Sequence, residues 1–540
     1  MAMKRTQWMS LATLFSGFFV LTNCNPTESN PADGGANDAN PDAQIALPAC
    51  GATGSGTYVV SVSPKDGEQR TLRLPMIVIK TSAEVQCPTA PPSLTATSGT
   101  VPTTSDCTKP TKILTLVPKQ DLAYLTSYTL RLEGLMDAQG KAVPACQVTF
   151  QTKSKTAAIS TQGAASFARD EDGTLWIWAD PINATRTNRT NDDLSVPEKV
   201  DLGGKKIVAM SMGNGFGVAA TEDGALWTWG NNLRGQLGRS TKATPHQPPG
   251  KAMLTLPANV TIVSVAAGVD HALLARSDGK VMAWGRNDSR ELGDGTTAEQ
   301  LAPHEVPGLT DVIAVSAGTG SSGKGVIEGG WSLALKSDGT VWGFGSNAFG
   351  ALSLPILQDP TYGTPTQLPL QNVKAIAAGY DQGYALLKDG TVRAWGESFD
   401  GGLGNDTCQD GPLATPASVL GASGALDNVV AVSAGHQYGV AARTDGTLWG
   451  WGNDSSGQLG DGTKGKDYQC NPNFTATGIQ KKPIAIAGVT DALSVAADET
   501  MTLVLLRDGT VLGAGYNPNN QIGVGGKDTY VLTFKKVPGL

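Results

Sequence analysis

Two glycine-rich stretches come within one residue of the phosphate-binding pattern G-x₄-G-K-[ST]. They are GTGSSGKG at Gly318–Gly325 and GDGTKGKD at Gly460–Asp467. Both lack the final hydroxyl that would ligate Mg²⁺, and neither precedes a predicted helix whose N-terminus would bind the phosphate. We therefore predict no nucleotide site.

The acidic residues of NDSSGQLGDGT, at Asn453–Thr463, are of the type that calcium-binding loops use. The spacing of a calcium-binding loop is absent, and the glycines more simply serve turns with positive φ, which Asp and Asn side chains close by bonding nearby backbone. The Asp-Gly pair also lacks the residue that separates Asp and Gly in the sialidase Asp-box. We predict no metal and no cofactor.

The histidines do not form a nucleophile motif with any serine or cysteine. There are four of them: His246, His271, His304 and His436. His271 lies three residues after a repeated glycine, where other copies of the repeat carry Phe216, Gln382, Tyr438 and Met501, so we predict a packing role for it. We predict no catalytic residue and no enzyme; a hydrolase site formed between repeat units is the alternative.

An Asp-Gly pair recurs through the second part of the chain, at intervals of 51 to 63 residues. The seven aspartates are Asp172, Asp223, Asp278, Asp338, Asp389, Asp445 and Asp508. Six residues after each one stand Trp178, Trp229, Trp284, Phe344, Trp395, Trp451 and Ala514. Large residues mostly precede these by two positions, which is the period of a strand. The fixed place of the tryptophans predicts packing between units rather than a sugar-stacking platform.

These residues resemble the repeats of the regulator of chromosome condensation family, through VPGLTDVIAVSAG at Val306–Gly318 and DGTLWGWGNDSSGQLGDGT at Asp445–Thr463. The resemblance covers 154–540 and implies a seven-bladed β-propeller. The first copy lacks the glycine-rich loop after Trp178. The chain ends in KKVPGL, where another copy would begin, so we expect the two ends of this region to meet and close the ring.

The fourth copy alone carries a ten-residue insertion, between Gly318 and the strand that precedes Asp338. An extension of this kind is often a tolerated surface loop, but it is also where propellers acquire partner contacts. We predict a partner-binding loop that includes Thr319, Ser321, Ser322, Lys324 and Glu328.

Residues 48–153 contain short stretches with the alternation of half-buried strands, which predicts a β-sandwich. VSVSPKDG at its start and VTFQTK at its end resemble the bacterial Ig-like domain of the S-layer type, usually a spacer or an adhesive element. It holds four of the six disulfide candidates, and their connectivity stays open. The candidates are Cys50, Cys87, Cys107 and Cys146 here, and Cys408 and Cys470 in two loops on successive repeats.

Residues 1–23 have the basic start and short apolar stretch of an export signal. The LTNC ending resembles the lipobox of bacterial lipoproteins, which implies lipidation of Cys24. Residues 24–47 are rich in Asn, Pro, Asp, Gly and Ala and predict a disordered tether.

Composition favours an all-β protein, because charged residues make up 16% and the 67 glycines and 31 prolines indicate many turns. A net charge of −7 without a basic stripe argues against nucleic acid as a partner. We predict a monomeric scaffold, lipid-anchored in the bacterial cell envelope, that binds an unidentified protein through propeller loops and does not exchange guanine nucleotides. The alternatives are an enzyme acting on envelope glycans and a purely structural envelope protein.

Overall fold

The computed structural model describes most of the chain from Val59 to Leu540. Its description of 59–540 leaves out 64–67, 72–76, 97–98, 108, 120–121, 125, 153, 164, 180–196, 243–246, 321–328, 399, 408–411, 466–478 and 527. The described residues form strands and turns without a helix, in agreement with the predicted all-β class. Within these residues no helix is long and apolar enough to cross a membrane.

Strands β1 to β9 form two sheets that share one hydrophobic core. The first sheet has the order β1 (Val59–Ser63), β3 (Ile77–Val85), β7 (Thr111–Pro118) and β6 (Thr103–Asp106). The second has the order β2 (Glu68–Thr71), β9 (Cys146–Thr152), β8 (Ser127–Leu132), β4 (Ser93–Ala96) and β5 (Gly99–Val101). Burial alternates along β9, as expected of a strand with one face on a core.

The cysteines of this two-sheet region are partly described. Cys87 and Cys107 form a disulfide with their Cα atoms 5.4 Å apart. Cys146 is also disulfide-bonded. Cys50 lies outside the described residues, as do Cys24, Cys408 and Cys470.

Removing the Cys87–Cys107 bridge by the double substitution Cys87→Ala/Cys107→Ala is expected to lower the free energy of unfolding of the two-sheet region by about 3 kcal/mol. The bridge closes a loop with a sequence separation of 20, and a cross-link of that span restricts the unfolded chain by about this amount. Urea denaturation followed by circular dichroism measures the loss. Thr104→Ala, an exposed change in the same loop, is the control, and an equal effect of the two variants would contradict the prediction.

Seven consecutive four-stranded antiparallel sheets follow among the described residues. The first three are β10 (Thr156–Gln162), β11 (Ala165–Asp170), β12 (Leu175–Ala179) and β13 (Glu198–Val200); β14 (Ile207–Gly213), β15 (Phe216–Thr221), β16 (Leu226–Gly230) and β17 (Gln247–Lys251); and β18 (Ile262–Ala267), β19 (His271–Arg276), β20 (Val281–Gly285) and β21 (Gln300–Glu305). The next two are β22 (Val312–Gly318), β23 (Trp331–Lys336), β24 (Val341–Ser346) and β25 (Thr361–Gln367); and β26 (Val373–Ala378), β27 (Gln382–Leu387), β28 (Val392–Gly396) and β29 (Leu413–Ser418). The last two are β32 (Val429–Ala434), β33 (Tyr438–Arg443), β34 (Leu448–Asn453) and β35 (Ile479–Ala485); and β36 (Ala492–Ala497), β37 (Met501–Leu506), β38 (Val511–Tyr516) and β39 (Tyr530–Lys536). A small hairpin of β30 (Leu420–Gly421) and β31 (Gly424–Ala425) precedes β32.

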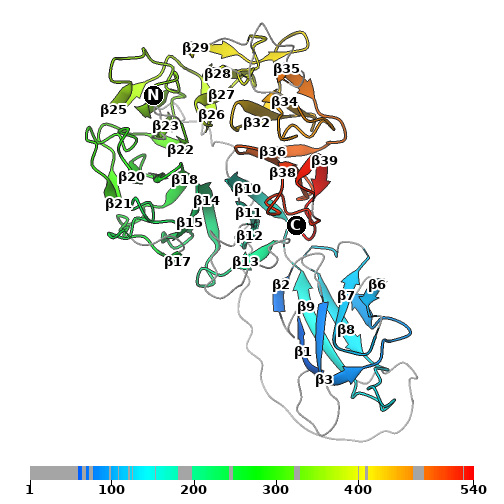
Figure 1. Cartoon of the computed structure of the whole chain (residues 1–540). Coiled ribbons are helices and arrows are strands. Elements are labelled where there is room, and N and C mark those ends of the chain that lie inside the picture. Colours follow the sequence, from blue (N-terminus) through cyan, green and yellow to red (C-terminus); the bar gives the residue numbers. More distant parts are fainter. Residues whose placement is uncertain are drawn as a thin grey trace, which may run out of the picture. The chain divides into compact units, whose positions relative to one another are not determined.

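The first strand of each sheet faces a common centre (Figure 1). These inner strands contact one another in sequence, and β36 contacts β10, so the sheets close on themselves in the manner of a β-propeller. Serine hydroxyls join neighbouring inner strands at five places by accepting a backbone N–H of the next sheet. The bonds run from Met212 to Ser160, Ala267 to Ser211, Val315 to Ser264, Ala378 to Ser316 and Ala497 to Ser433.

The repeated tryptophans pack between sheets, as predicted. Trp178, Trp229, Trp284, Trp395 and Trp451 are fully buried. The indole of Trp284 donates to the backbone oxygen of Gln236, and that of Trp451 to Gly402, each in the glycine-rich loop of the preceding sheet. A Cβ at Gly404 would lie 2.8 Å from the Trp451 ring. Glycine therefore lets this loop lie on the next aromatic ring.

The ring closes between the last and first sheets, in agreement with the prediction. Val537 and Leu540, from the final VPGL, are fully buried against Trp176 and Trp178. The Ser166 hydroxyl donates to the Gln521 backbone oxygen at 2.8 Å across a separation of 355 residues.

The Asp-Gly turns are held by side-chain bonds of the predicted kind. Asp445 accepts the backbone N–H of Thr447 at 3.0 Å and its hydroxyl at 2.7 Å. These bonds lower the pKa of Asp445. Gly446 follows with φ of 82°, a left-handed conformation that favours glycine.

Candidate partner-binding site at the channel mouth

The inner strands enclose a channel of about 260 Å³. Small side chains leave this space open, because alanine, serine and valine dominate its wall. They include Ser160, Ala266, Ala317, Ala377, Ser433 and Ala496. The volume is below the ~300–1,000 Å³ of sites for drug-sized ligands, so the channel admits a side chain rather than a large small molecule.

One mouth of the channel is built by the loops between the first two strands of the sheets. Its lining residues are Gln162, Thr319, Tyr380, His436, Asp498 and Glu499. The Tyr380 and His436 rings meet edge to face with their centroids 4.4 Å apart. Burial lowers the pKa of His436, against the effect of Asp400, so the imidazole is neutral at pH 7. The mouth combines an aromatic pair with two carboxylates.

Asp498 stands where five other sheets have the repeated glycine, at Gly213, Gly268, Gly318, Gly379 and Gly435. At Gly435 a Cβ would lie 1.9 Å from the Tyr438 ring, whereas the last sheet has Met501 in place of that tyrosine and accommodates an aspartate. Asp498 is 3% exposed, and neither of its carboxylate oxygens makes a hydrogen bond of good geometry with a described group. Burial and the neighbouring Glu499 raise its pKa well above the usual range, although the backbone N–H groups of Glu499 and Gly163 offset part of this effect.

Other buried acids lie in the loops that follow the third strand of three sheets, after β20, β28 and β34. Burial raises the pKa values of Glu291, Glu397 and Asp454 to about 7. Asp400 adds to the shift of Glu397, whose carboxylate accepts the Gln437 side-chain amide at 2.9 Å. These loops are therefore rich in carboxyl groups that change charge near neutral pH.

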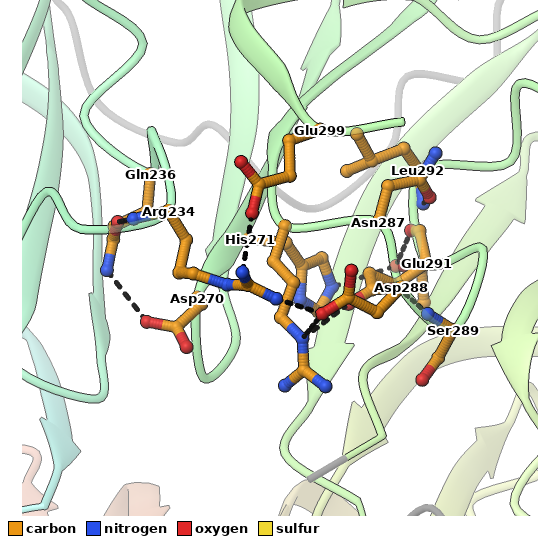
Figure 2. Close-up of polar contacts among 12 residues, drawn as sticks. Arg234, Gln236, Asp270, His271, Asn287, Asp288, Ser289, Glu291, Leu292 and Glu299 are labelled. Carbon is orange, nitrogen blue, oxygen red and sulfur yellow. Dashed lines mark hydrogen bonds and ion pairs between the residues drawn. The ribbon is translucent and has the colours of Figure 1, made fainter. Parts of the chain in front are cut away.

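A network of ion pairs joins two neighbouring loops (Figure 2). Arg234 extends from the loop after β16 and pairs with Asp288 and Glu299 of the loop after β20. Gln236 accepts the Arg234 backbone N–H and donates to Asp270 at 2.7 Å. The network fixes these loops relative to the strand ends that carry them.

His271 and Ser332 form a hydrogen bond between adjacent sheets, 3.0 Å from Nε2 to Oγ. Both side chains are 1% exposed or less, so this pair has no access for a substrate. The Ser332 hydroxyl donates to the Glu291 backbone oxygen. Burial and the neighbouring Arg286 lower the pKa of His271 to about 3. These contacts agree with the packing role predicted for His271, while its serine partner was not predicted.

Of the predicted partner-binding loop, the structure describes Thr319. Ser321, Ser322, Lys324 and Glu328 lie outside the described residues. Thr319 lines the channel mouth, and its backbone N–H donates to the Gly379 oxygen at 3.1 Å. The N–H of Gly329 donates to Gly320 at 2.9 Å, so both attachment points of the insertion lie at the mouth.

The melting temperature is expected to rise as the pH falls from about 8 to about 6.5. The carboxyls of Glu291, Glu397 and Asp454 have pKa values of about 7 in the folded protein and of about 4 in an unfolded chain. The folded protein therefore binds more protons between these values, and each such carboxyl adds up to about 1.4 kcal/mol of stability per pH unit of acidification. Thermal denaturation at several pH values tests this.

His271 sets the lower limit of that window. Its pKa is about 3 in the folded protein and about 6.5 in an unfolded chain, so it costs stability as the pH falls below about 6.5 and opposes the carboxyls there. Glu397→Gln should flatten the rise between about pH 8 and 6.5. A melting temperature that falls on acidification in this window would contradict the assignment.

Comparison with known proteins identifies repeats in this ring of sheets. The Regulator of chromosome condensation (RCC1) repeat matches residues 223–275 and 278–323, and a second description of the same repeat matches 207–236, 262–290 and 429–458. RCC1 repeats are thus present in the chain.

Similar curated proteins include mouse E3 ubiquitin-protein ligase HERC2, 28% identical over 268 residues, or 48% of this chain and 5% of HERC2. Ultraviolet-B receptor UVR8 of Arabidopsis thaliana is 26% identical over 60% of this chain and 68% of the receptor. Protein pim1 of Schizosaccharomyces pombe is 25% identical over 63% of this chain and 66% of pim1. This chain thus spans only about a twentieth of HERC2 but some two thirds of the other two.

Solved structures share the β-propeller fold. Prp20p of Saccharomyces cerevisiae aligns with a TM-score of 0.57 and 20% identity, over 70% of this chain and 87% of Prp20p. Yeast RCC1 (Prp20) bound to Kap60 aligns with a TM-score of 0.56 and 21% identity, over 70% and 84% of the two chains. Human WBSCR16 aligns with a TM-score of 0.53 and 20% identity, over 67% and 89%.

Proposed function

We propose that this chain is a lipid-anchored scaffold of the bacterial cell envelope that binds a protein partner at the channel mouth of its propeller. Lipidated Cys24 is the anchor, 24–47 the tether, 48–153 an Ig-like spacer, and 154–540 a seven-bladed propeller made of the seven four-stranded sheets.

One observation supports the binding role most strongly: the side chains at the channel mouth differ from sheet to sheet, whereas the inner strands below them repeat. The inner strands repeat small residues, yet the positions just beyond them hold Thr319, Tyr380, His436 and Glu499, with Asp498 in place of a glycine. A repeated scaffold whose loops differ at one end is typical of binding surfaces.

Propellers with the same fold are described as binding proteins: yeast RCC1 is bound to Kap60, and Prp20p has binding properties to Gsp1p and histones. These likenesses support a protein ligand and do not identify it. We propose no guanine nucleotide exchange, because an exported chain would meet no pool of GTP.

Site-specific photo-cross-linking of the full-length protein in its native envelope tests the proposal. Gln162, half-buried at the mouth, and Asp491, exposed near the start of an inner strand, are replaced in turn by a photo-reactive amino acid. A discrete protein adduct from position 162 and none from position 491 is the expected result. No adduct from either position would overturn the binding role and favour a purely structural protein.

A glycan-acting enzyme is the second candidate, and one loop favours it. Burial and the neighbouring Asp400 raise the pKa of Glu397 to about 7, as for the acid of a glycosidase carboxyl pair. Both side chains are buried, so this activity requires the loop to open for its substrate. Release of sugars from envelope glycans by the intact protein, lost in Glu397→Gln, would establish this activity; equal release by both proteins or none would dismiss it.

A further inference from the structure

We propose that the channel mouth recognises its protein partner by taking up one basic side chain, a lysine or an arginine, whose cationic group pairs with the carboxylates of Asp498 and Glu499. This inference rests on the proposed function and specifies the chemistry of the partner at the same site.

Asp498 is the first observation that points to a cationic ligand. Neither carboxyl oxygen of Asp498 makes a hydrogen bond of good geometry with a described group, and a buried carboxyl group in that state is costly. A glycine occupies the same position in the sheets of Gly213, Gly268, Gly318, Gly379 and Gly435. The last sheet thus carries an acid where the repeat itself needs no side chain. A positively charged donor that enters the channel recovers this cost, because Asp498 then releases its proton to solvent and accepts a charge-assisted hydrogen bond, which is stronger than a neutral one.

The surroundings of Asp498 suit a long side chain with a charged end. The wall of alanines and valines can contact an aliphatic stem, as with Ala317 and Ala378. Tyr380 presents an aromatic ring at the mouth, which favours a cation nearby, and the neutral His436 does not repel one. The volume of about 260 Å³ equals roughly nine waters at ~30 Å³ each, which leaves room for one long side chain together with several waters.

A divalent metal fits this mouth less well than an organic cation. Ca²⁺ takes about six to eight oxygen ligands, and Asp498 and Glu499 supply at most four carboxylate oxygens. Among the described residues, no three His, Cys, Asp or Glu side chains are grouped as ligands. The favoured ligand is an ammonium or guanidinium group.

The probe for the test is n-butylammonium, which has the shape of a lysine side chain, and n-butanol is its uncharged counterpart. Saturation-transfer NMR with the full-length protein measures the binding of each. The expected result is binding of n-butylammonium and not of n-butanol, weakened at least tenfold in Asp498→Asn. The matched control Asp491→Asn, an exposed acid near the start of the same strand, should bind as the unchanged protein does. n-Propylguanidinium in the same assay distinguishes arginine from lysine.

Asp498→Gly restores the residue that the other sheets have at this position. It should also lose n-butylammonium binding, and it keeps the test valid if Asp498→Asn fails to fold. Equal binding of n-butylammonium by both Asp498 variants and the unchanged protein would overturn the inference, as would equal binding of n-butanol. The two proposals fail separately. A cross-link from position 162 without amine binding preserves the protein partner and removes its basic side chain from the proposal, whereas amine binding without a cross-link preserves the cation site and removes the protein partner.

Discussion

Replacing Trp451 by alanine is expected to lower the free energy of unfolding by about 3–5 kcal/mol, because the change leaves a cavity between two sheets. The indole is fully buried, lies edge to face on Tyr384 with centroids 5.6 Å apart, and donates to the Gly402 backbone oxygen at 2.9 Å. Both contacts cross from one sheet to the one before it. Urea denaturation followed by circular dichroism measures the loss.

Trp449→Ala is the matched control, two residues away on the same face of the same strand. Trp449 is only partly buried, with the Arg443 guanidinium 5.7 Å from its ring centre, a contact worth about 0.5–1 kcal/mol at such a site. We expect a loss of about 1 kcal/mol. Equal losses for the two variants would show that the repeated buried tryptophan is not the main contact between sheets.

The double substitution Val537→Ala/Leu540→Ala is expected to lower the free energy of unfolding by about 3–6 kcal/mol, on the scale of two buried aliphatic side chains. Both residues are fully buried against the first sheet. The change opens the place where the last sheet meets the first. Thermal and urea denaturation measure the effect.

An internal copy of the same motif provides the comparison. Val306 and Leu309 are buried in the same way between two sheets in the middle of the chain, so Val306→Ala/Leu309→Ala removes the same atoms. If the ring is closed as tightly at its ends as elsewhere, the two double variants lose similar stability. A negligible loss from the terminal pair alone would mean that the closure contributes little.

The strands that carry the repeat could be predicted from the sequence because their residues recur at fixed spacing. The outer strands could not be predicted in this way. β17 has the sequence QPPGK, in which prolines usually argue against a strand. It forms because an outer strand pairs on one side only, here with Trp227 opposite Lys251 and Thr228 opposite Gly250.

The candidate site was predicted only in outline, because its contacts join residues far apart in the chain. The sequence shows that Asp498 replaces a repeated glycine, but its burial depends on the meeting of β36 with β10. His271 and Ser332, 61 residues apart, likewise meet only because adjacent sheets bring them together. The repeat periodicity indicates which residues share a position within a sheet; it carries no information on which side chains lie opposite each other between sheets.

The five serine bonds between inner strands all have the same direction, with an amide of the following sheet donating to a hydroxyl of the sheet before it. Each of these hydrogen bonds needs one serine from one repeat and one backbone N–H from the next. Duplication of a repeat would therefore create new bonds of the same type. The serines therefore leave the number of sheets unspecified. The number of sheets in the ring depends instead on the angle between neighbouring sheets. Aromatic side chains hold the outer parts of the sheets apart, while small residues let the inner strands converge.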